Sequence, residues 1–444
     1  MNLIEAIYNA LRLPELRNKI LFTGGLLVAF RLFANISIPN ASQQALSQLF
    51  NSQALLGLLD LFSGGGLSTF SVVAMGVNPY INASIIMQLM TVISERVKEI
   101  SKEGEQGRRR ITRWTRYLTV ALALGQAYGY TVLFQNVNPP ILPQNMDWFQ
   151  RVTIMVTMTS GTILAMWFGE LITEYGIGNG ISLVIFAGII GRGPRTIYST
   201  IVGHTGSGGL ADYLPFLVLI IIALVAIAFV IEVQQAVRKI PIQSAQRLTG
   251  GRTVQGRQSF LPLRVNQAGV IPIIFALSIM TFPGIVAGYL QATPTGTWWH
   301  DAALWVQGNF TPSSANPTAA ISYNVLYFLF IFGFTYFYTA VTFDVNDVAD
   351  NLRRYSSFIP GIRPGRPTAE YLATVMNRIT FAGALFLGLI TVVLPLGAAR
   401  VTNIPQNQMY LGGTALLIVV GVALDTMKQL ETQLVMRQYR GFIR

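Results

Sequence analysis

Ten long apolar segments recur along the chain, and its positive charge is sorted among the gaps between them. The segments lie at residues 20–38, 74–94, 115–135, 152–172, 181–199, 213–233, 269–290, 321–343, 374–397 and 409–427. The 31 lysines and arginines lie in or directly beside the N-terminal tail, the even-numbered gaps and the C-terminal tail, except for Arg31, Arg151, Arg192, Arg195 and Arg400. Cytoplasmic loops of membrane proteins retain Lys and Arg, whereas a soluble protein has no reason to sort them. The pattern therefore predicts ten transmembrane helices with both termini in the cytoplasm.

The composition supports a membrane protein and excludes several kinds of chemistry. Charged residues make up 11% of the chain, against roughly 25% in soluble domains. A net charge of +12 would suit nucleic-acid binding, but its confinement to alternate gaps favours membrane topology, with anionic lipid or ribosomal RNA as secondary partners. The chain has no cysteine, which excludes disulfides and thiol redox chemistry. No motif predicts a metal or cofactor.

The ten segments divide into an N-terminal half, 20–199, and a C-terminal half, 213–427, joined by an external connection at 200–212. Five spans in each half would leave the halves oppositely oriented, as in inverted-repeat membrane folds, although the halves share no convincing sequence match. Residues 1–19 carry apolar positions at helical spacing and predict a cytoplasmic amphipathic helix on the membrane surface. Residues 428–444 form a cytoplasmic tail.

The external gap at 39–73 contains an apolar, glycine-rich stretch, Leu61-Phe62-Ser63-Gly64-Gly65-Gly66. It is apolar enough to enter a membrane but too broken by glycine to cross one. Irregular backbone at membrane depth persists only where protein or a water-filled cavity surrounds it. Residues 57–73 therefore predict either a short half-helix that enters the interior of the protein or an ordinary surface loop with a glycine hinge.

The long cytoplasmic gap at 234–268 predicts a pair of extended arms. Ile240-Pro241-Ile242 and Phe260-Leu261-Pro262-Leu263 flank Thr249-Gly250-Gly251, which has the composition of a turn. Six arginine and lysine residues are distributed along this gap, so the arms carry strong positive charge.

A second cytoplasmic gap, 344–373, carries paired turns around one arginine. Pro360-Gly361 and Pro364-Gly365 fix the backbone on either side of Arg363. Arg363 is therefore either a side chain presented to a partner or a solvated arginine that only maintains topology.

The residues do not support an enzyme. The stretch from Gly251 to Gln258 superficially resembles a phosphate-binding loop, but Arg257 and Gln258 stand where that motif needs Lys and then Ser or Thr. The two histidines, His204 and His300, lie in external gaps, far from any buried serine or carboxylate on a span. We therefore predict no catalytic site.

Coupled transport of ions or protons needs carboxylates or histidines inside the spans. The acidic candidates all lie at or near predicted cytoplasmic ends, where water reaches them: Glu170, Glu232, Asp344 and Asp425. No proton relay is therefore predicted at mid-membrane.

Two spans carry aliphatic side chains at helical spacing, Val77 with Ile81 and Ile181 with Ile185. Residues four apart share a helix face, and such faces normally contact lipid or neighbouring helices. Polar residues on the second span, among them Asn82, indicate instead that this span meets water or a cavity. The residues alone leave a protein-conducting channel and a secondary transporter of small solutes equally open.

Seven motifs occur in one order along almost the whole chain: FSGGG at 62–66, PYINASIIMQ at 79–88, KEGEQGRRR at 102–110, YGIGNGISLVIFAGI at 175–189, LPLRVNQAGVIPI at 261–273, VADNLRRYSSFIPGIRPG at 348–365 and GGTALLIV at 412–419. Together they resemble the SecY family, which forms the central subunit of the Sec protein-translocation channel. Glycine-rich pieces are weak signals singly, but seven in register on a ten-span pattern are highly specific. The resemblance implies an all-α membrane fold of ten helices in two five-helix, pseudo-inverted halves around an hourglass pore, without enzymatic activity or a cofactor.

The resemblance also implies roles for particular residues. A constriction ring would comprise Val77, Ile81, Ile181, Ile185, Ile274 and Ile418, with Val77 standing where isoleucine is commoner. The segment 57–73 would be a plug beneath the ring, centred on Leu61, Phe62, Ser63, Gly64, Gly65 and Gly66. A lateral gate between the second and seventh spans would have Asn82, Gln88 and Phe282 near its seam. Arg252 and Arg363 would lie on the cytoplasmic loops that engage the ribosome or the SecA motor ATPase.

The resemblance further implies partners and a location. A SecE-like subunit would brace the outside, a SecG-like subunit would attach, and an unfolded preprotein would be the substrate. The location would be a bacterial plasma membrane rather than a plastid membrane. The resemblance favours the channel over the small-solute transporter, as does the lack of charged ligands at mid-membrane in the spans. Residues 291–320 match no pattern and receive no role.

Overall fold

The computed structural model describes residues 13–39, 41–52, 57, 60, 63–136, 140–204, 210–244, 247–249, 252–254, 258–290, 297–310, 317–402 and 412–441. Residues 1–12, which make up most of the predicted surface helix, lie outside the described residues. So do Leu61 and Phe62 of the predicted plug and Gly250 and Gly251 of the predicted turn.

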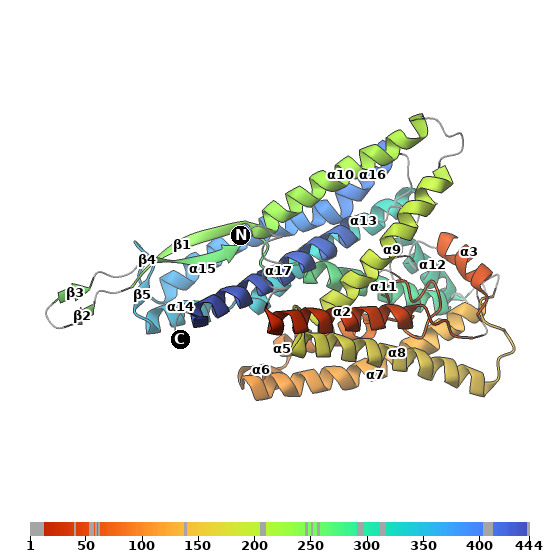
Figure 1. Ribbon diagram of the computed structural model, residues 1–444, viewed down its shortest axis with the longest axis horizontal. Coiled ribbons are helices and arrows are strands. Elements are labelled where there is room, and N and C mark those ends of the chain that lie inside the picture. The colour runs from red at the N-terminus through yellow and green to blue at the C-terminus, as the bar shows by residue number, and fades with distance from the viewer. Residues whose placement is uncertain are drawn as a thin grey trace.

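Each of the ten apolar segments falls mainly on a long helix of the described chain (Figure 1). These helices are α2 (Pro14–Ala34), α5 (Asn78–Ile93), α7 (Glu105–Asn136), α8 (Trp148–Tyr175), α9 (Gly180–His204), α10 (Leu210–Gln235), α11 (Ile271–Leu290), α13 (Pro317–Thr342), α15 (Arg366–Gly388) and α17 (Gly413–Gly441). α15 continues through a π-helical turn, η1 (Leu389–Val393), into α16 (Leu394–Thr402). Helices are expected here because hydrocarbon leaves backbone groups no partners outside their own segment.

Six stretches of the described chain are long and apolar enough to cross a membrane: Glu105–Gln135, Trp148–Tyr175, Leu214–Gln235, Ala320–Arg354, Arg366–Thr402 and Gly413–Met436. Shorter apolar stretches occur in α9 and α11. α5 has only 16 residues because it starts at Asn78, after a chain of turns. The helices therefore agree with ten spans, and the number that cross the membrane stays a prediction.

The long helices form two groups (Figure 1). α2, α5, α7, α8 and α9 pack on one another, and α10, α11, α13, α17 and the continuous α15–η1–α16 form the other group. The groups meet where α11 contacts α5 and α7 and where α9 contacts α10 and α17. This arrangement confirms the predicted all-α architecture of two helical halves.

Short helices lie between the long ones: α3 (Gln43–Ser52), α6 (Glu95–Lys102), α12 (Trp298–Phe310) and α14 (Val345–Arg354). α12 falls in the segment 291–320 that the sequence left unassigned, and it packs against α11 and α13. Asp344 caps α14, because its carboxylate accepts hydrogen bonds from the backbone N–H groups of Asn346 (2.9 Å) and Asp347 (3.3 Å).

A long β-hairpin projects from the helices, as the sequence predicted for the gap 234–268 (Figure 1). β1 (Val237–Ser244) pairs antiparallel with β4 (Gln258–Arg264), and Ile240 stands opposite Leu261. Towards the tip, β2 (Arg247–Thr249) pairs with β3 (Arg252–Val254). β5 (Ser357–Phe358) adds to the other edge of β1, so the sheet order is β4-β1-β5.

Candidate functional site

The six predicted ring residues come from four helices or their first turns and belong to, or pack against, one large hydrophobic cluster. The backbone carbonyl of Val77 accepts a hydrogen bond from the N–H of Ile81 (3.0 Å), so these side chains lie one turn apart at the start of α5. The others come from α9, α11 and α17. Val77, Ile81, Ile185, Ile274 and Ile418 are buried in one hydrophobic cluster, and Ile181 packs against it. We call these six residues the aliphatic waist.

α9 reaches the waist because glycines let it approach α8 closely. A Cβ atom on Gly180 would overlap the carbonyl oxygen of Gly169 on α8. The N–H of Gly180 also donates to the hydroxyl of Thr173 (2.9 Å). The Gly178-Asn179-Gly180 sequence before Ile181 thus serves helix packing.

A polar cavity of about 710 Å³ lies beside the waist. Amide side chains from α9, α10, the segment before α11, and α17 line it, among them Asn179, Gln234, Asn266, Gln267, Gln429 and Gln433. Val270 and Val422 also line it. Val422 belongs to the same hydrophobic cluster as the waist and Val270 packs against it. Each valine is four residues from a waist residue, so the cavity begins about one helical turn from the waist.

Three features follow one another along α9. Ser182 borders the polar cavity, Ile185 belongs to the waist, and Gly188 closely approaches Gly64, which lies in the loop before α5. Three residues of helix rise by about 4.5 Å. Along α9 the polar cavity and the aliphatic waist therefore overlap between Asn179 and Ile185, and the contacts with the buried loop follow from Gly188 onward.

Residues 63–76, within and just after the predicted half-helix, form a loop that we call the buried loop. Residues 57, 60 and 63 are helical, whereas residues 64–70 form turns. Gly64 has φ +67° and Gly65 has φ +92°, a region that glycine enters without the steric cost of a Cβ atom. Residues 64–70 therefore do not continue the half-helix predicted over 57–73, because these two glycines leave the helical conformation.

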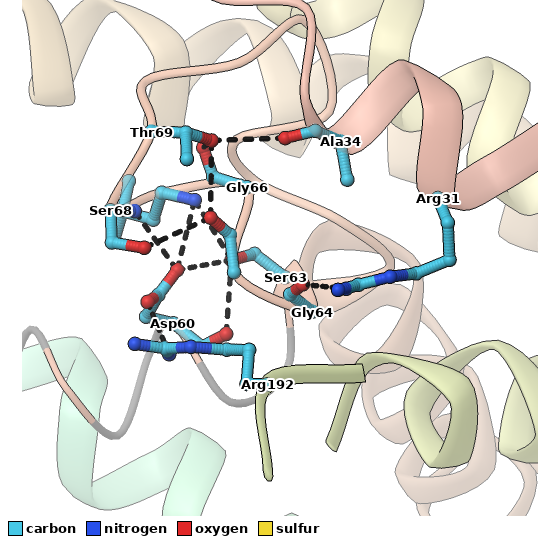
Figure 2. A network of polar contacts seen from close by, with 11 residues as sticks. Arg31, Ala34, Asp60, Ser63, Gly64, Gly66, Ser68, Thr69 and Arg192 are labelled. Carbon is cyan, nitrogen blue, oxygen red and sulfur yellow. Dashed lines mark hydrogen bonds and ion pairs between the residues drawn. The ribbon is translucent and has the colours of Figure 1, made fainter. Parts of the chain in front are cut away.

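A buried carboxylate organises the loop (Figure 2). Asp60 is 0% exposed, and its Oδ1 atom accepts hydrogen bonds from the backbone N–H groups of Leu67 and Ser68, each at 3.0 Å. The hydroxyl of Ser63 also donates to this oxygen (2.9 Å). The second oxygen, Oδ2, forms an ion pair with Arg192 of α9.

α2 holds the loop from another side (Figure 2). The guanidinium of Arg31 donates to the carbonyl oxygen of Gly64, and the hydroxyl of Thr69 donates to the carbonyl oxygen of Ala34 (2.9 Å). Arg31 is a cation inside a predicted span, and its hydrogen bond to Gly64 explains why a charged side chain occurs there.

Backbone hydrogen bonds and apolar packing also hold the loop in place. Segments 36–38 and 70–72 form an antiparallel bridge with two backbone hydrogen bonds of 2.8 and 3.0 Å. Leu67 and Phe70 are buried, and the Phe70 ring meets the Phe134 ring of α7 edge-on, with centroids 5.4 Å apart.

We expect Gly64→Ala to loosen the buried loop. A Cβ atom there would lie 2.8 Å from the Cα atom of Gly188, and left-handed backbone costs other residues about 1–2 kcal/mol. At 1.4 kcal/mol per tenfold, the unseated population rises roughly 5- to 30-fold. The chain has no cysteine, so the maleimide labelling rate of Ser71→Cys, at a fully buried position, measures this population.

Gly104→Ala is the matched control. Gly104 also has a positive φ, +74°, but a Cβ atom added there would meet no other part of the chain within 4 Å, and the position is far from the loop. Equal labelling of Ser71→Cys in the Gly64→Ala and Gly104→Ala backgrounds would contradict the described seat.

The predicted gate residues lie on two helices in contact. Asn82 and Gln88 are half-buried on α5, and Phe282 lies on α11, where only its backbone is described. α5 and α11 touch each other across the boundary between the two helix groups.

The two predicted docking loops form one body at their bases. β5 pairs with β1 through Phe358 opposite Gln243, and Ile240 and Leu263 of the hairpin share a hydrophobic cluster with Leu372 of α15. Sequence reasoning treated the loops separately, because no local pattern reports pairing between distant segments.

Arg363 and Arg252 occupy different parts of this body. Arg363 is exposed between turns whose glycines, Gly361 and Gly365, have φ +83° and +101°. Its carbonyl oxygen accepts a hydrogen bond from the hydroxyl of Thr368 (2.8 Å). Arg252 begins β3 in the tip hairpin, well away from β5 and α14 (Figure 1).

The acidic candidates make surface contacts. Glu170 pairs with Arg116 at 2.8 Å, and Asp425, 67% exposed, lies 3.9 Å from Arg264. Within the described ranges, no group of three or more His, Asp or Glu side chains could hold a metal ion.

Sequence reasoning missed the contacts of Asp60. Their signal was present, because Arg31 and Arg192 are two of the five cations that break the sorting of charge among the gaps. A cation inside an apolar span requires an acceptor there, and the carboxylate and the carbonyl oxygen supply it.

Comparisons with known proteins agree with this geometry. A family model described as SecY matches residues 71–427. The protein translocase subunit SecY of Streptomyces coelicolor is 42% identical, and the match covers 100% of both chains.

Solved structures share the fold. A SecY channel whose plug domain is described as stabilising its closed state has a TM-score of 0.63 at 17% identity, covering 94% of this chain and 92% of that one. The canine Sec61 channel in a ribosome complex has a TM-score of 0.59, also at 17% identity, with the same coverage of each chain. The family model, the full-length relative and the shared fold together show that the chain belongs to the SecY family.

Proposed function

We propose that the protein is the central subunit of a protein-conducting channel that passes unfolded polypeptides across a membrane. The observation that carries this proposal is the aliphatic waist, to which four helices contribute, with a polar cavity beside it and a buried loop further along α9. Membership of a family of translocase subunits supports it. A small-solute transporter is not favoured, because the matching family model and the full-length relative are translocase subunits.

The waist would act as the constriction ring of the pore. A narrow aliphatic passage excludes water and ions when nothing occupies it, because dewetting makes ion entry unfavourable. Aliphatic side chains also offer a passing polypeptide neither charges nor hydrogen bonds that would retain it. The buried loop, in this proposal, is the plug that adds a second barrier.

The contact between α5 and α11 would open as a lateral gate, with Asn82, Gln88 and Phe282 near its seam. A 20-residue segment of Leu and Ile gains roughly 6–12 kcal/mol by entering the bilayer, at ~0.3–0.6 kcal/mol per residue. One central Arg costs only roughly 2.5–3.5 kcal/mol on the same scale, so a strongly apolar segment still leaves into lipid. A polar segment continues through the pore.

Partners would supply the driving force. The basic loops that carry Arg252 and Arg363 would dock a ribosome or a SecA-type motor ATPase, and the canine Sec61 channel is described in a ribosome complex. SecE-like and SecG-like subunits would bind the lipid-facing surface. α10 suits such contacts, since only 11% of the apolar part of its Leu214–Gln235 stretch is buried.

The proposed location is the plasma membrane of a bacterium, with both termini and both docking loops in the cytoplasm. The sorting of Lys and Arg supports this orientation, and the bacterial relative supports the membrane.

Reconstitution tests the proposal. The protein and its SecE-like subunit in liposomes, with a SecA-type ATPase and ATP, should carry an unfolded preprotein to a protease-protected interior. Translocation that proceeds equally without the protein would refute the proposal, as would accumulation of a small solute driven by an ion gradient.

A further inference from the structure

We infer that Asp60 and Arg192 form a latch that fastens the buried loop to α9, and that breaking this ion pair releases the loop while α5 and α11 stay together. The inference rests on the proposed channel function and assigns its regulation to two residues. It makes plug release and lateral opening two separate steps.

The two carboxylate oxygens of Asp60 make different contacts (Figure 2). Oδ1 holds the turn together from within, through Leu67, Ser68 and Ser63. Oδ2 faces Arg192, so this oxygen fastens the turn to another element. A fully buried carboxylate is unfavourable without a compensating charge, so the loop keeps its seat only while the cation is present.

The surface of α9 fits the loop closely. A Cβ atom on Gly65 would lie 3.0 Å from Cδ of Arg192, so the arginine stem lies across this glycine. Gly64 approaches the backbone of Gly188 one turn earlier on α9. The Arg192 side chain is 27% exposed, which leaves it a path to water once the carboxylate departs.

The loop contacts several segments. Its hydrogen bonds and ion pair, including those of Asp60, reach α2 and the residues just after it, and they reach α9 at Arg192. At its C-terminal end the loop continues into α5, where the N–H of Asn78 donates to the carbonyl oxygen of Met75 (3.3 Å). α2 and α9 pack on each other within the first helix group. The ion pair between Asp60 and Arg192 involves neither α5 nor α11, so breaking it leaves the packing between these two helices in place.

Asp60→Asn tests the latch most selectively. Asparagine keeps a carbonyl oxygen that can accept the loop's hydrogen bonds, but it removes the charge and places an N–H₂ group toward the guanidinium. We expect the resting ion conductance of the reconstituted channel to rise about tenfold or more. Arg192→Gln should raise it further, because it leaves a buried carboxylate unpaired.

The double variant Asp60→Asn/Arg192→Gln identifies a direct interaction. With neither charge present there is no unpaired charge, so its conductance should fall below that of Arg192→Gln. Arg400→Gln, at an exposed arginine near the end of α16, is the control and should match the wild type. If the single variants fail to assemble with the SecE-like subunit while the double variant succeeds, the same coupling is demonstrated.

A second readout separates the latch from the gate. In the cysteine-free chain, disulfide yield between Gln88→Cys on α5 and Phe282→Cys on α11 reports whether the two helices stay together. We expect the disulfide yield with Asp60→Asn to stay within about twofold of the yield in the same double-cysteine chain without that substitution. Unchanged resting conductance in both single variants would overturn the latch, and a loss of disulfide yield in parallel with the leak would overturn the separation of the steps. A wild-type channel that carries no preprotein would instead refute the proposed function.

Discussion

Replacing Ile81 and Ile185 together by serine should raise the ion leak through the resting channel at least about tenfold. Both side chains are buried in the aliphatic waist, on α5 and α9 respectively. Removing each from the waist deletes about 1.5–3 kcal/mol of apolar burial, and 1.4 kcal/mol corresponds to a factor of ten. Hydroxyl groups there would also stabilise water in the constriction. Single-channel recording in planar bilayers measures the effect.

The chain offers a matched control on the same two helices. Ile86 and Ile190 are 40% and 47% exposed, so Ile86→Ser/Ile190→Ser makes the same chemical change away from the waist. Its resting conductance should equal that of the wild type. Equal conductance of the two double variants would contradict the assignment of the waist as the seal.

Reversing the charge of Arg363 should reduce motor-driven translocation about thirtyfold or more. Charge reversal at a docking hot spot costs at least about 2 kcal/mol, and repulsion of the partner's acidic groups adds to that loss. The fold should survive, because Gly361, Gly365 and the hydrogen bond from Thr368 hold the backbone rather than the arginine side chain. ATP-dependent import of a preprotein into proteoliposomes measures the rate.

Arg354→Glu is the control for Arg363→Glu. Arg354 is exposed in the last turn of α14, in the same loop region, and its replacement makes the same change of charge. We expect it to retain most of the activity. Equal losses in both variants would indicate a general electrostatic effect and would remove the specific role of Arg363.

The sequence predicted the helices well because length and hydrophobicity are local properties. Boundaries were less accurate where turns intervene. The second span was placed from residue 74, but α5 begins at Asn78, because Gly76 takes φ +53° and Pro79 lies in the first turn of the helix. The π-helical turn Leu389–Val393 inside the ninth span was also not predicted, since a shift in backbone pairing has no simple sequence pattern.

The hairpin and the buried loop show where sequence reasoning succeeds and fails. The arms around Pro241 and Pro262 were predicted, because a turn between extended segments is a local signal. The pair between Asp60 and Arg192 joins residues far apart in the chain, and only the folded structure brings them together. The waist residues were named from resemblance, since an isoleucine that lines a pore and one that faces lipid have the same local pattern.

Photo-crosslinking of a stalled preprotein tests the central claim most directly. A photoreactive amino acid is placed at one position of a preprotein whose folded C-terminal domain stops it midway through the channel, and the cross-linked residues are mapped by mass spectrometry. The account predicts cross-links to Val77, Ile81, Ile185, Ile274 and Ile418 from at least two of the four contributing helices. Cross-links confined to outward-facing residues such as Ile86 and Ile190, with none at the waist, would contradict it.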